Sequence, residues 1–188
     1  MSDFLKPVQR RSIARRQSRP TVQSLAFVIT PPPHIRSDVA VLKDDVHYLL
    51  GHDFMDRYEK AGIPLFTYSD EHWEEMIQYV KNKTKQFKPF NVFIKNMNVM
   101  VQGKHRNIYL DIVNKYPFRE MMEKMIREDI DYFPHLPLAC HLSSEDFYKI
   151  WSSLKDVPYS QHFTCDRLTV LIRSERKWIK LQELFLEG

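Results

Sequence analysis

The sequence predicts an α+β fold in which two similar lobes of mixed, mostly antiparallel sheet, with flanking helices, surround a central cleft. Apolar runs of strand length alternate with segments of helical period, and two of the strands read as a hairpin. The chain has only four glycines, none in a Gly-rich phosphate turn. A P-loop and a dinucleotide fingerprint both need such a turn, which disfavours a doubly wound parallel sheet.

The first half is predicted to read strand, helix, strand, helix. Its opening apolar strand ends at three consecutive prolines, as a buried strand that enters a loop does. Ser37 or Asp38 is expected to cap the first helix, and Ser69 the second. The predicted elements are a strand over 24–30, a helix over 37–50, a strand over 63–68 and a helix that follows Ser69.

The second half is predicted to begin with one additional strand, then to repeat this order, and then to add three strands. A turn around Gly103 joins the two strands of the hairpin. Ser143 and Ser144 give the last helix a strong N-terminal signal. The predicted elements are strands over 90–94 and 107–112, a Met-rich helix over 117–130, a strand over 136–139, a helix over 144–154, and strands over 161–164, 168–172 and 178–185.

The positive charge of the chain is concentrated at its start. Residues 1–23 hold six Lys or Arg and one Asp, a net charge of +5, so residues 24–188 sum to −1 in a chain of net +4. We therefore predict a flexible basic arm over 1–23 and a 2-lobed domain over 24–188, without the basic surface that duplex nucleic acid requires. The arm is a solvated segment, an auxiliary phosphate contact or an organellar targeting segment; its arginines include Arg10, Arg11, Arg15 and Arg16.

Cysteine use and hydropathy point to a cytoplasmic protein. Cys140 and Cys165 are far apart and have no metal-binding or redox spacing, which suits a reducing compartment. No apolar run approaches the roughly 18 residues of a membrane span, so no membrane partner is expected. The remaining histidines follow no metal-ligand spacing, and neither a metal nor a cofactor is predicted.

The segment Pro134–Ala139 carries the most specific signal in the chain. Its sequence, Pro-His-Leu-Pro-Leu-Ala, resembles the second signature of the 2H phosphoesterases, the superfamily of 2′-5′ RNA ligase-like proteins and cyclic nucleotide phosphodiesterases. The resemblance covers about residues 24–186. It is best after Phe133, where a helix over 145–151, a strand with Phe163, the segment 166–173 and Lys177-Trp178 follow one another as in the family.

The resemblance implies two His-x-Thr strands that face each other across a cleft. In the family each imidazole moves a proton and each hydroxyl holds a phosphate oxygen, with no metal. Here His135 matches the second imidazole, but Pro137 replaces the second Thr. In the first motif Gly62 replaces the His and Pro64 replaces the Thr. Because proline has neither a hydroxyl nor a backbone donor, we predict a degenerate site.

Other residues are weaker candidates for this site. His72 and His141 are candidate catalytic helpers, and Thr67 and Tyr68 offer hydroxyls in the first lobe. Arg106 lies near the hairpin turn and is a candidate substrate contact. For each of these an ordinary surface role is the alternative, and His135 itself is alternatively a hydrogen-bonded core histidine.

Three functions follow from these residues. The first is a nucleotide or RNA-end binder with weak or no catalysis. The second is an active cyclic phosphodiesterase or RNA 2′-5′ ligase in which other groups work with His135. The third is an interaction module whose basic arm docks onto an acidic protein partner. A cleft packed shut by Pro64 and Pro137 would leave only the third.

Overall fold

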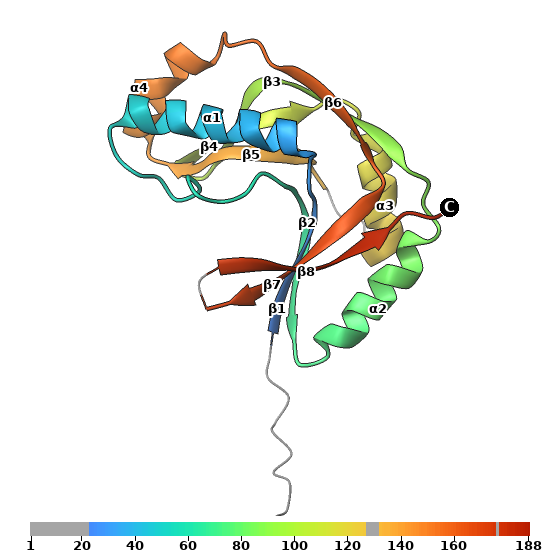
Figure 1. The fold of residues 1–188 in the computed structure, drawn as a ribbon. Coiled ribbons are helices and arrows are strands. Elements are labelled where there is room, and N and C mark those ends of the chain that lie inside the picture. Colours follow the sequence, from blue (N-terminus) through green and yellow to red (C-terminus); the bar gives the residue numbers. More distant parts are fainter. Residues whose placement is uncertain (1–22, 127–131, 176) are drawn as a thin grey trace, which may run out of the picture.

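The computed structural model describes residues 23–126, 132–175 and 177–188, and its elements follow the predicted order (Figure 1). The helices and strands are β1 (Gln23–Ile29), α1 (Pro33–Leu50), β2 (Ile63–Asp70), α2 (Trp73–Thr84), β3 (Phe90–Gln102), β4 (His105–Ile112), α3 (Tyr116–Ile126), β5 (His135–Leu142), α4 (Ser144–Leu154), β6 (Ser160–Cys165), β7 (Arg167–Ser174) and β8 (Lys177–Phe185). No helix in this part of the chain is long and apolar enough to cross a membrane.

The strands form two sheets of four, ordered β2-β1-β7-β8 (sheet A) and β5-β4-β3-β6 (sheet B). All neighbouring strands are antiparallel. The units β1-α1-β2-α2 and β4-α3-β5-α4 match each other, since in each the second strand is a sheet edge next to the first. The α+β fold with two similar lobes is thus confirmed, and β2 and β5 are equivalent strands.

In each half of the chain, one helix packs against the other lobe. Helix α1 follows β1 of sheet A but packs against α4 and β5 of the second half. Helix α3 follows β4 of sheet B but lies beside α2 (Figure 1), where the Tyr79 hydroxyl donates a 2.9 Å hydrogen bond to the Met125 carbonyl. The exchange makes the packing of each lobe depend on both halves.

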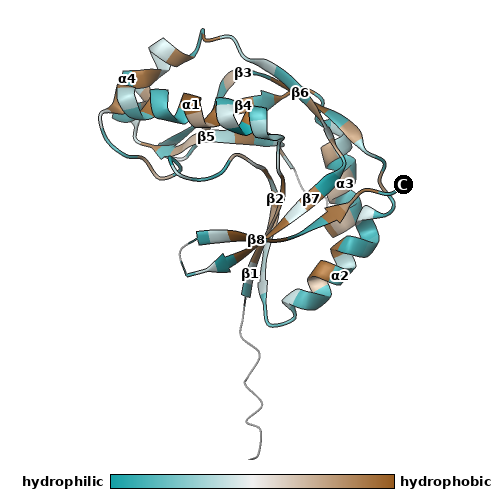
Figure 2. Ribbon diagram, viewed as in Figure 1, coloured by the Kyte–Doolittle hydropathy of each residue, from teal (hydrophilic) through white to brown (hydrophobic). Residues whose placement is uncertain are grey.

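One face of each sheet packs into the core, and the alternation of the strands sets which residues do so. Leu25, Phe27 and Ile29 of β1 are at most 1% exposed. Met121, Met122 and Met125 of α3 are buried too, as the apolar period of that helix predicts. Figure 2 shows hydrophobic and hydrophilic residues alternating along α1 and α2, as on helices with one buried face.

The opposite face of each sheet, here called the polar face, carries the candidate site. On sheet A the register places Pro64, Val28, Thr169 and Glu183 in one row across β2, β1, β7 and β8. On sheet B it places His135, Asp111, Lys95 and Ser160 in one row across β5, β4, β3 and β6.

Several boundaries differ from the prediction, and three of these differences have a clear local cause. Helix α1 begins at Pro33 and not at 37, because proline suits the first helical position, where no backbone donor is needed. Ser69 does not cap α2; it lies in β2, its hydroxyl donates to Ser24 at 2.9 Å, and α2 begins at Trp73. Strand β3 runs on to Gln102 because its pairing with β4 continues to that end.

One helix prediction is confirmed, and another falls partly outside the described residues. Ser143 caps α4 as predicted, with its hydroxyl accepting from the Asp146 amide at 3.0 Å. The end predicted for the Met-rich helix, 127–130, falls outside the described residues, as does the arm up to residue 22.

Candidate functional site

His135 opens β5 on the polar face of sheet B and is half-buried among aromatic rings. The centroid of its imidazole lies 5.5 Å from the Tyr109 ring and 5.8 Å from the Phe133 ring, which stacks on it at 29°. The imidazole thus packs against two aromatic rings.

A backbone hydrogen bond sets the tautomer of His135. Its Nδ1 lies 2.9 Å from the Phe133 carbonyl oxygen, which can only accept, so Nδ1 carries the proton. Nε2 is then the nitrogen with the lone pair in the neutral ring. Burial lowers the pKa of His135, although the hydrogen bond to Phe133 opposes this shift. At neutral pH the imidazole is therefore a base and a hydrogen-bond acceptor at Nε2.

One ion pair lies beside this imidazole. Asp111 is directly opposite His135 in the β4–β5 register, and the Lys115 ammonium is 3.1 Å from its Oδ1. The same ammonium lies 4.2 Å from the centroid of the Phe133 ring. Lys115 thus brings a cation near His135, and Asp111 offsets part of its charge.

The equivalent place on β2 has no imidazole. Gly62 precedes β2, and Pro64 pairs with Val28 within it. The carbonyl of Pro64 accepts a 2.7 Å hydrogen bond from the Tyr132 hydroxyl, which links the segment before β5 to β2. Pro64 is exposed and Pro137 is half-buried. The two prolines therefore do not close the motif positions to a ligand.

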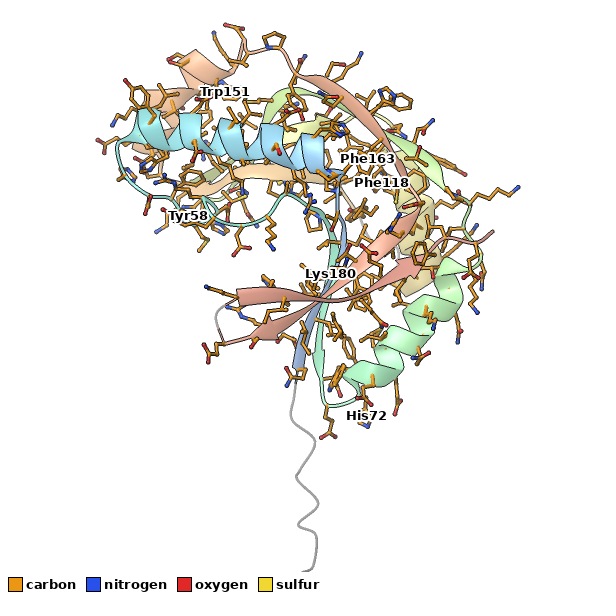
Figure 3. The ribbon with its side chains drawn as sticks, viewed as in Figure 1. Tyr58, His72, Phe118, Trp151, Phe163 and Lys180 are labelled. Atoms are coloured by element: carbon orange, nitrogen blue, oxygen red, sulfur yellow. The ribbon has the colours of Figure 1, made fainter. Side chains whose placement is uncertain are left out.

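The two candidate helpers lie at strand ends far from the motifs. His141 is six residues beyond His135 on β5, a separation of about 20 Å along a strand. Its backbone has φ 57°, and its ring lies 5.8 Å from that of His105. His72 follows the other end of β2 from Pro64 (Figure 3), and its hydrogen bond to Asp70 raises its pKa. Neither lies next to His135 along the strands.

The remaining predicted residues are also dispersed. Thr67 and Tyr68 help to line a pocket between β2 and the helices α2 and α3, and burial raises the pKa of Tyr68. Arg106 bonds to the carbonyls of Gly103 and His105 in its own hairpin. Arg10, Arg11, Arg15 and Arg16 lie outside the described residues.

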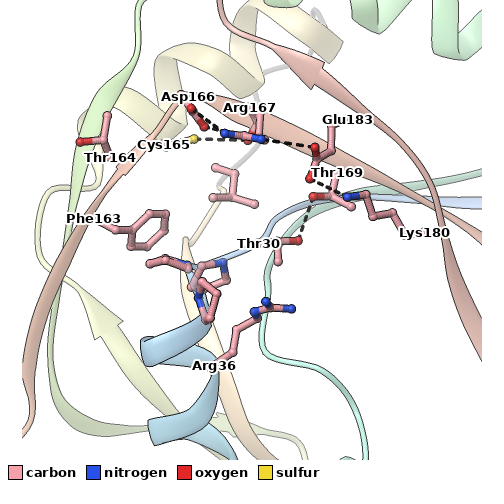
Figure 4. A pocket seen from close by; sticks show the side chains of 14 residues that line it. Thr30, Arg36, Phe163, Thr164, Cys165, Asp166, Arg167, Thr169, Lys180 and Glu183 are labelled. Atoms are coloured by element: carbon pink, nitrogen blue, oxygen red, sulfur yellow. Dashed lines mark hydrogen bonds and ion pairs between the residues drawn. The ribbon is translucent and has the colours of Figure 1, made fainter.

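A pocket of about 520 Å³ lies where the two sheets meet (Figure 4). Residues of β1, β7 and β8 line it from sheet A and residues of β6 from sheet B, with the start of α1 closing one side. Its apolar wall includes Phe163 and the three prolines before α1. The volume is in the range of small-molecule sites. His135 does not line this pocket.

Hydroxyls and ion pairs make up the polar wall of this pocket. The Thr30 and Thr169 hydroxyls are 2.9 Å apart and share a hydrogen bond. Glu183 accepts from Lys180 at 2.8 Å and from Arg167 at 3.3 Å, and the Lys180 hydrogen bond lowers the pKa of Glu183. Asp166 pairs with both guanidinium ends of Arg167 at 2.8 and 2.9 Å.

Metal and thiol chemistry find little support in the described residues. No three His, Cys, Asp or Glu of that part of the chain are placed to hold a metal ion. Burial raises the pKa of both thiols, Cys140 and Cys165, to about 12, which keeps them protonated and unreactive.

Sequence reasoning found His135 but missed its surroundings and the junction of the sheets. Asp111 lies near the end of β4 and Lys115 just before α3, and no sequence motif links either of them to His135. The lining residues of the pocket come from five elements, and no short motif joins Thr30 to Thr169 or Glu183.

Solved structures of known proteins share this architecture. The structure of E. coli LigT complexed with 3′-AMP matches with a TM-score of 0.62 at 12% identity, over 90% of this chain and 100% of that chain. LigT complexed with phosphate matches with a TM-score of 0.60 at 13% identity, over 89% and 99%. A structure described as a phosphoesterase matches with a TM-score of 0.54 at 12% identity, over 88% and 99%.

These matches concern the fold. No family model matches the chain, and no curated protein matches it in sequence. The resemblance to the 2H phosphoesterases, first indicated by the segment around His135, is thus confirmed at the level of the two-lobed fold.

Proposed function

We propose that the chain is a degenerate 2H phosphoesterase that binds the phosphate-bearing end of a nucleotide or an RNA, with weak or no catalysis. The observation that carries the proposal is the half-buried imidazole of His135, oriented by its hydrogen bond to Phe133, at a motif position of a LigT-like fold. LigT has been solved in complex with 3′-AMP, phosphate, ATP and NADP+, which supports a phosphate-bearing ligand.

The absent groups argue against efficient turnover. A two-imidazole mechanism needs a base for the nucleophile and an acid for the leaving oxygen. His135 supplies one imidazole, while Gly62 and Pro64 stand at the equivalent place on β2. Loss of one acid/base partner costs roughly 10²–10⁴ in rate. Without the motif hydroxyls, the phosphate oxygens also lose two contacts.

The retained groups favour binding. In its neutral form His135 accepts a hydrogen bond from a ribose or phosphate hydroxyl at Nε2, and the Lys115 ammonium lies over the Phe133 ring that stacks on His135. The arginines of the basic arm, Arg10, Arg11, Arg15 and Arg16, would add auxiliary contacts to the phosphates of a longer RNA.

The test measures binding and turnover in the same preparations. We expect 3′-AMP to bind by calorimetry, the affinity to fall as salt rises, and His135→Ala to weaken it about tenfold or more. His52→Ala is the control, because it removes an exposed imidazole that pairs with Asp146 near α4. Turnover of 2′,3′-cyclic AMP and a 2′-5′-linked dinucleotide is assayed in parallel.

The other two functions are outcomes of this test. Turnover that disappears in His135→Ala would show an active phosphodiesterase or ligase. A wild-type chain that binds no nucleotide at low salt would contradict the proposal and leave the protein-interaction module.

A further inference from the structure

We propose that the pocket between the sheets binds a second phosphate group, distinct from the group that His135 contacts. We call it the junction pocket and define it by Thr30, Arg36, Thr169, Lys180 and Glu183. The ligand would then be a nucleotide or RNA end with at least two phosphates. The choice of a nucleotide or RNA as the ligand rests on the proposed function. The pocket itself is built from residues other than His135.

The two threonines present a free donor to the pocket. Thr169 is only 3% exposed, yet its hydroxyl faces the Thr30 hydroxyl at 2.9 Å on the pocket wall. Two hydroxyls hold two protons, and the hydrogen bond between them uses one. The other proton remains available for an acceptor such as a phosphate oxygen.

Arg36 and the start of α1 add positive charge on the opposite side. In Figure 4 the Arg36 side chain extends from α1 towards Thr30, and no interaction joins it to the other lining residues drawn. Pro32 at the N-cap makes no side-chain hydrogen bond to the helix. The amides of His34 and Ile35 are thus left without a side-chain cap at the positive end of an 18-residue helix.

The ion pairs of β7 and β8 leave the pocket with a net positive charge. Three cations (Arg36, Arg167 and Lys180) line it with two carboxylates (Asp166 and Glu183), which gives +1. Because Glu183 is shared between Lys180 and Arg167, it neutralises neither completely. The Lys180 side chain is 57% exposed and remains free to turn towards an anion.

The shape of the pocket suits an organic phosphate better than a bare ion. About 520 Å³ exceeds the space that one phosphate needs, and Phe163 with the prolines forms an apolar wall. A ribose or base would lie against that wall, with its phosphate at Arg36 and the threonines.

The decisive experiment compares adenosine 3′,5′-bisphosphate with 3′-AMP by calorimetry and by amide NMR shifts. We expect the wild-type chain to bind the bisphosphate about tenfold more tightly. Inorganic phosphate alone should shift the amides of Thr30, Ile35 and Thr169. Arg36→Ala should abolish the tenfold gain, and Thr169→Val, which removes one hydroxyl, should reduce it.

The matched control is Arg119→Ala. Arg119 is the fourth residue of α3, as Arg36 is of α1, and both side chains are exposed. The control therefore removes the same charge from the equivalent helix, and we expect it to keep the tenfold gain. Dispersed amide spectra of each variant show that it has folded.

Each result separates this inference from the proposed function. Equal affinity for both nucleotides, or a gain that survives Arg36→Ala, would overturn the junction pocket. His135→Ala could leave the affinity for 3′-AMP unchanged while phosphate still shifts the amides of the junction pocket. This result would support the pocket and contradict the role of His135. Binding that depends on His135, without pocket shifts, would do the reverse.

Discussion

The two halves of the chain build the same β-α-β-α unit but keep different groups at equivalent places. In the second half, β5 carries His135 on its polar face, with Lys115 and Asp111 beside it. In the first half, the equivalent strand β2 offers Gly62 and Pro64. The two halves thus share one backbone arrangement, while an imidazole stands at this position in the second half and not in the first.

The opposite asymmetry holds at the two helix starts. The start of α1 borders the junction pocket with Arg36, which forms no ion pair with another described residue, and has no side-chain cap. The start of α3 follows Lys115, whose charge is paired with Asp111. Along the chain, the first half, which lacks the imidazole, therefore carries the cation without an ion pair among the described residues, and the second half, which has the imidazole, carries the paired one. The proposed ligand with two phosphates would meet a different group at each of these places.

Restoring both motifs gives the largest expected effect. We predict that the triple substitution G62H, P64T and P137T produces turnover of 2′,3′-cyclic AMP at least about 10²-fold above the wild-type rate, because it supplies the missing imidazole and both hydroxyls. A side chain fits at position 62, where an added Cβ would lie no closer than 3.7 Å to Val28. Product formation is followed by chromatography.

Two results delimit this prediction. Adding His135→Ala to the triple variant should remove the gained turnover, since the mechanism needs both imidazoles. A folded triple variant that binds 3′-AMP but turns over no faster than wild type would show that the two motif strands no longer face a common phosphate.

The exchange of helices predicts that the two lobes unfold together. Phe118 of α3 is fully buried and packs edge-on against Phe90 of β3, with ring centroids 5.2 Å apart. We expect Phe118→Ala to lower the free energy of unfolding by about 3–5 kcal/mol. Urea unfolding is monitored in variants that keep only Trp73 of α2 or only Trp151 of α4, and both probes should shift equally.

Tyr116→Ala provides the comparison on the same helix. Its side chain is 75% exposed, so we expect a change within about 0.5 kcal/mol. Two separate transitions, with only one displaced by Phe118→Ala, would show that the lobes are independent and that the exchanged helices do not couple them.

Features that depend on neighbouring residues could be predicted from the sequence, and features that depend on strand pairing could not. The α4 boundary followed from Ser143, because a cap acts within one turn. His135 was found because its motif is contiguous on one strand. The full length of β3 could not be predicted, because the strand extends as far as its pairing with β4. The junction pocket was also missed: Thr30 and Glu183 meet only through sheet order, which no local spacing records.

The smallest expected effect concerns the protonation of His135. Burial lowers its folded pKa below the ordinary value of 6.5, so the unfolded chain binds the proton more readily. The contribution of His135 to stability is therefore complete above about pH 6.5 and is lost as pH falls towards the folded pKa. His135→Gln lacks this proton, so its stability relative to wild type should rise between pH 7.5 and 5.

The difference in stability between wild type and His135→Gln separates the effect of His135 from that of the other histidines. His52 and His72 have raised pKa values through Asp53, Asp146 and Asp70, and they act with the opposite sign in both proteins. Urea midpoints at each pH measure the difference. If it stays constant across this range, the His135 imidazole is not desolvated, and the contrast between a sheltered imidazole in one half and an open strand in the other does not hold.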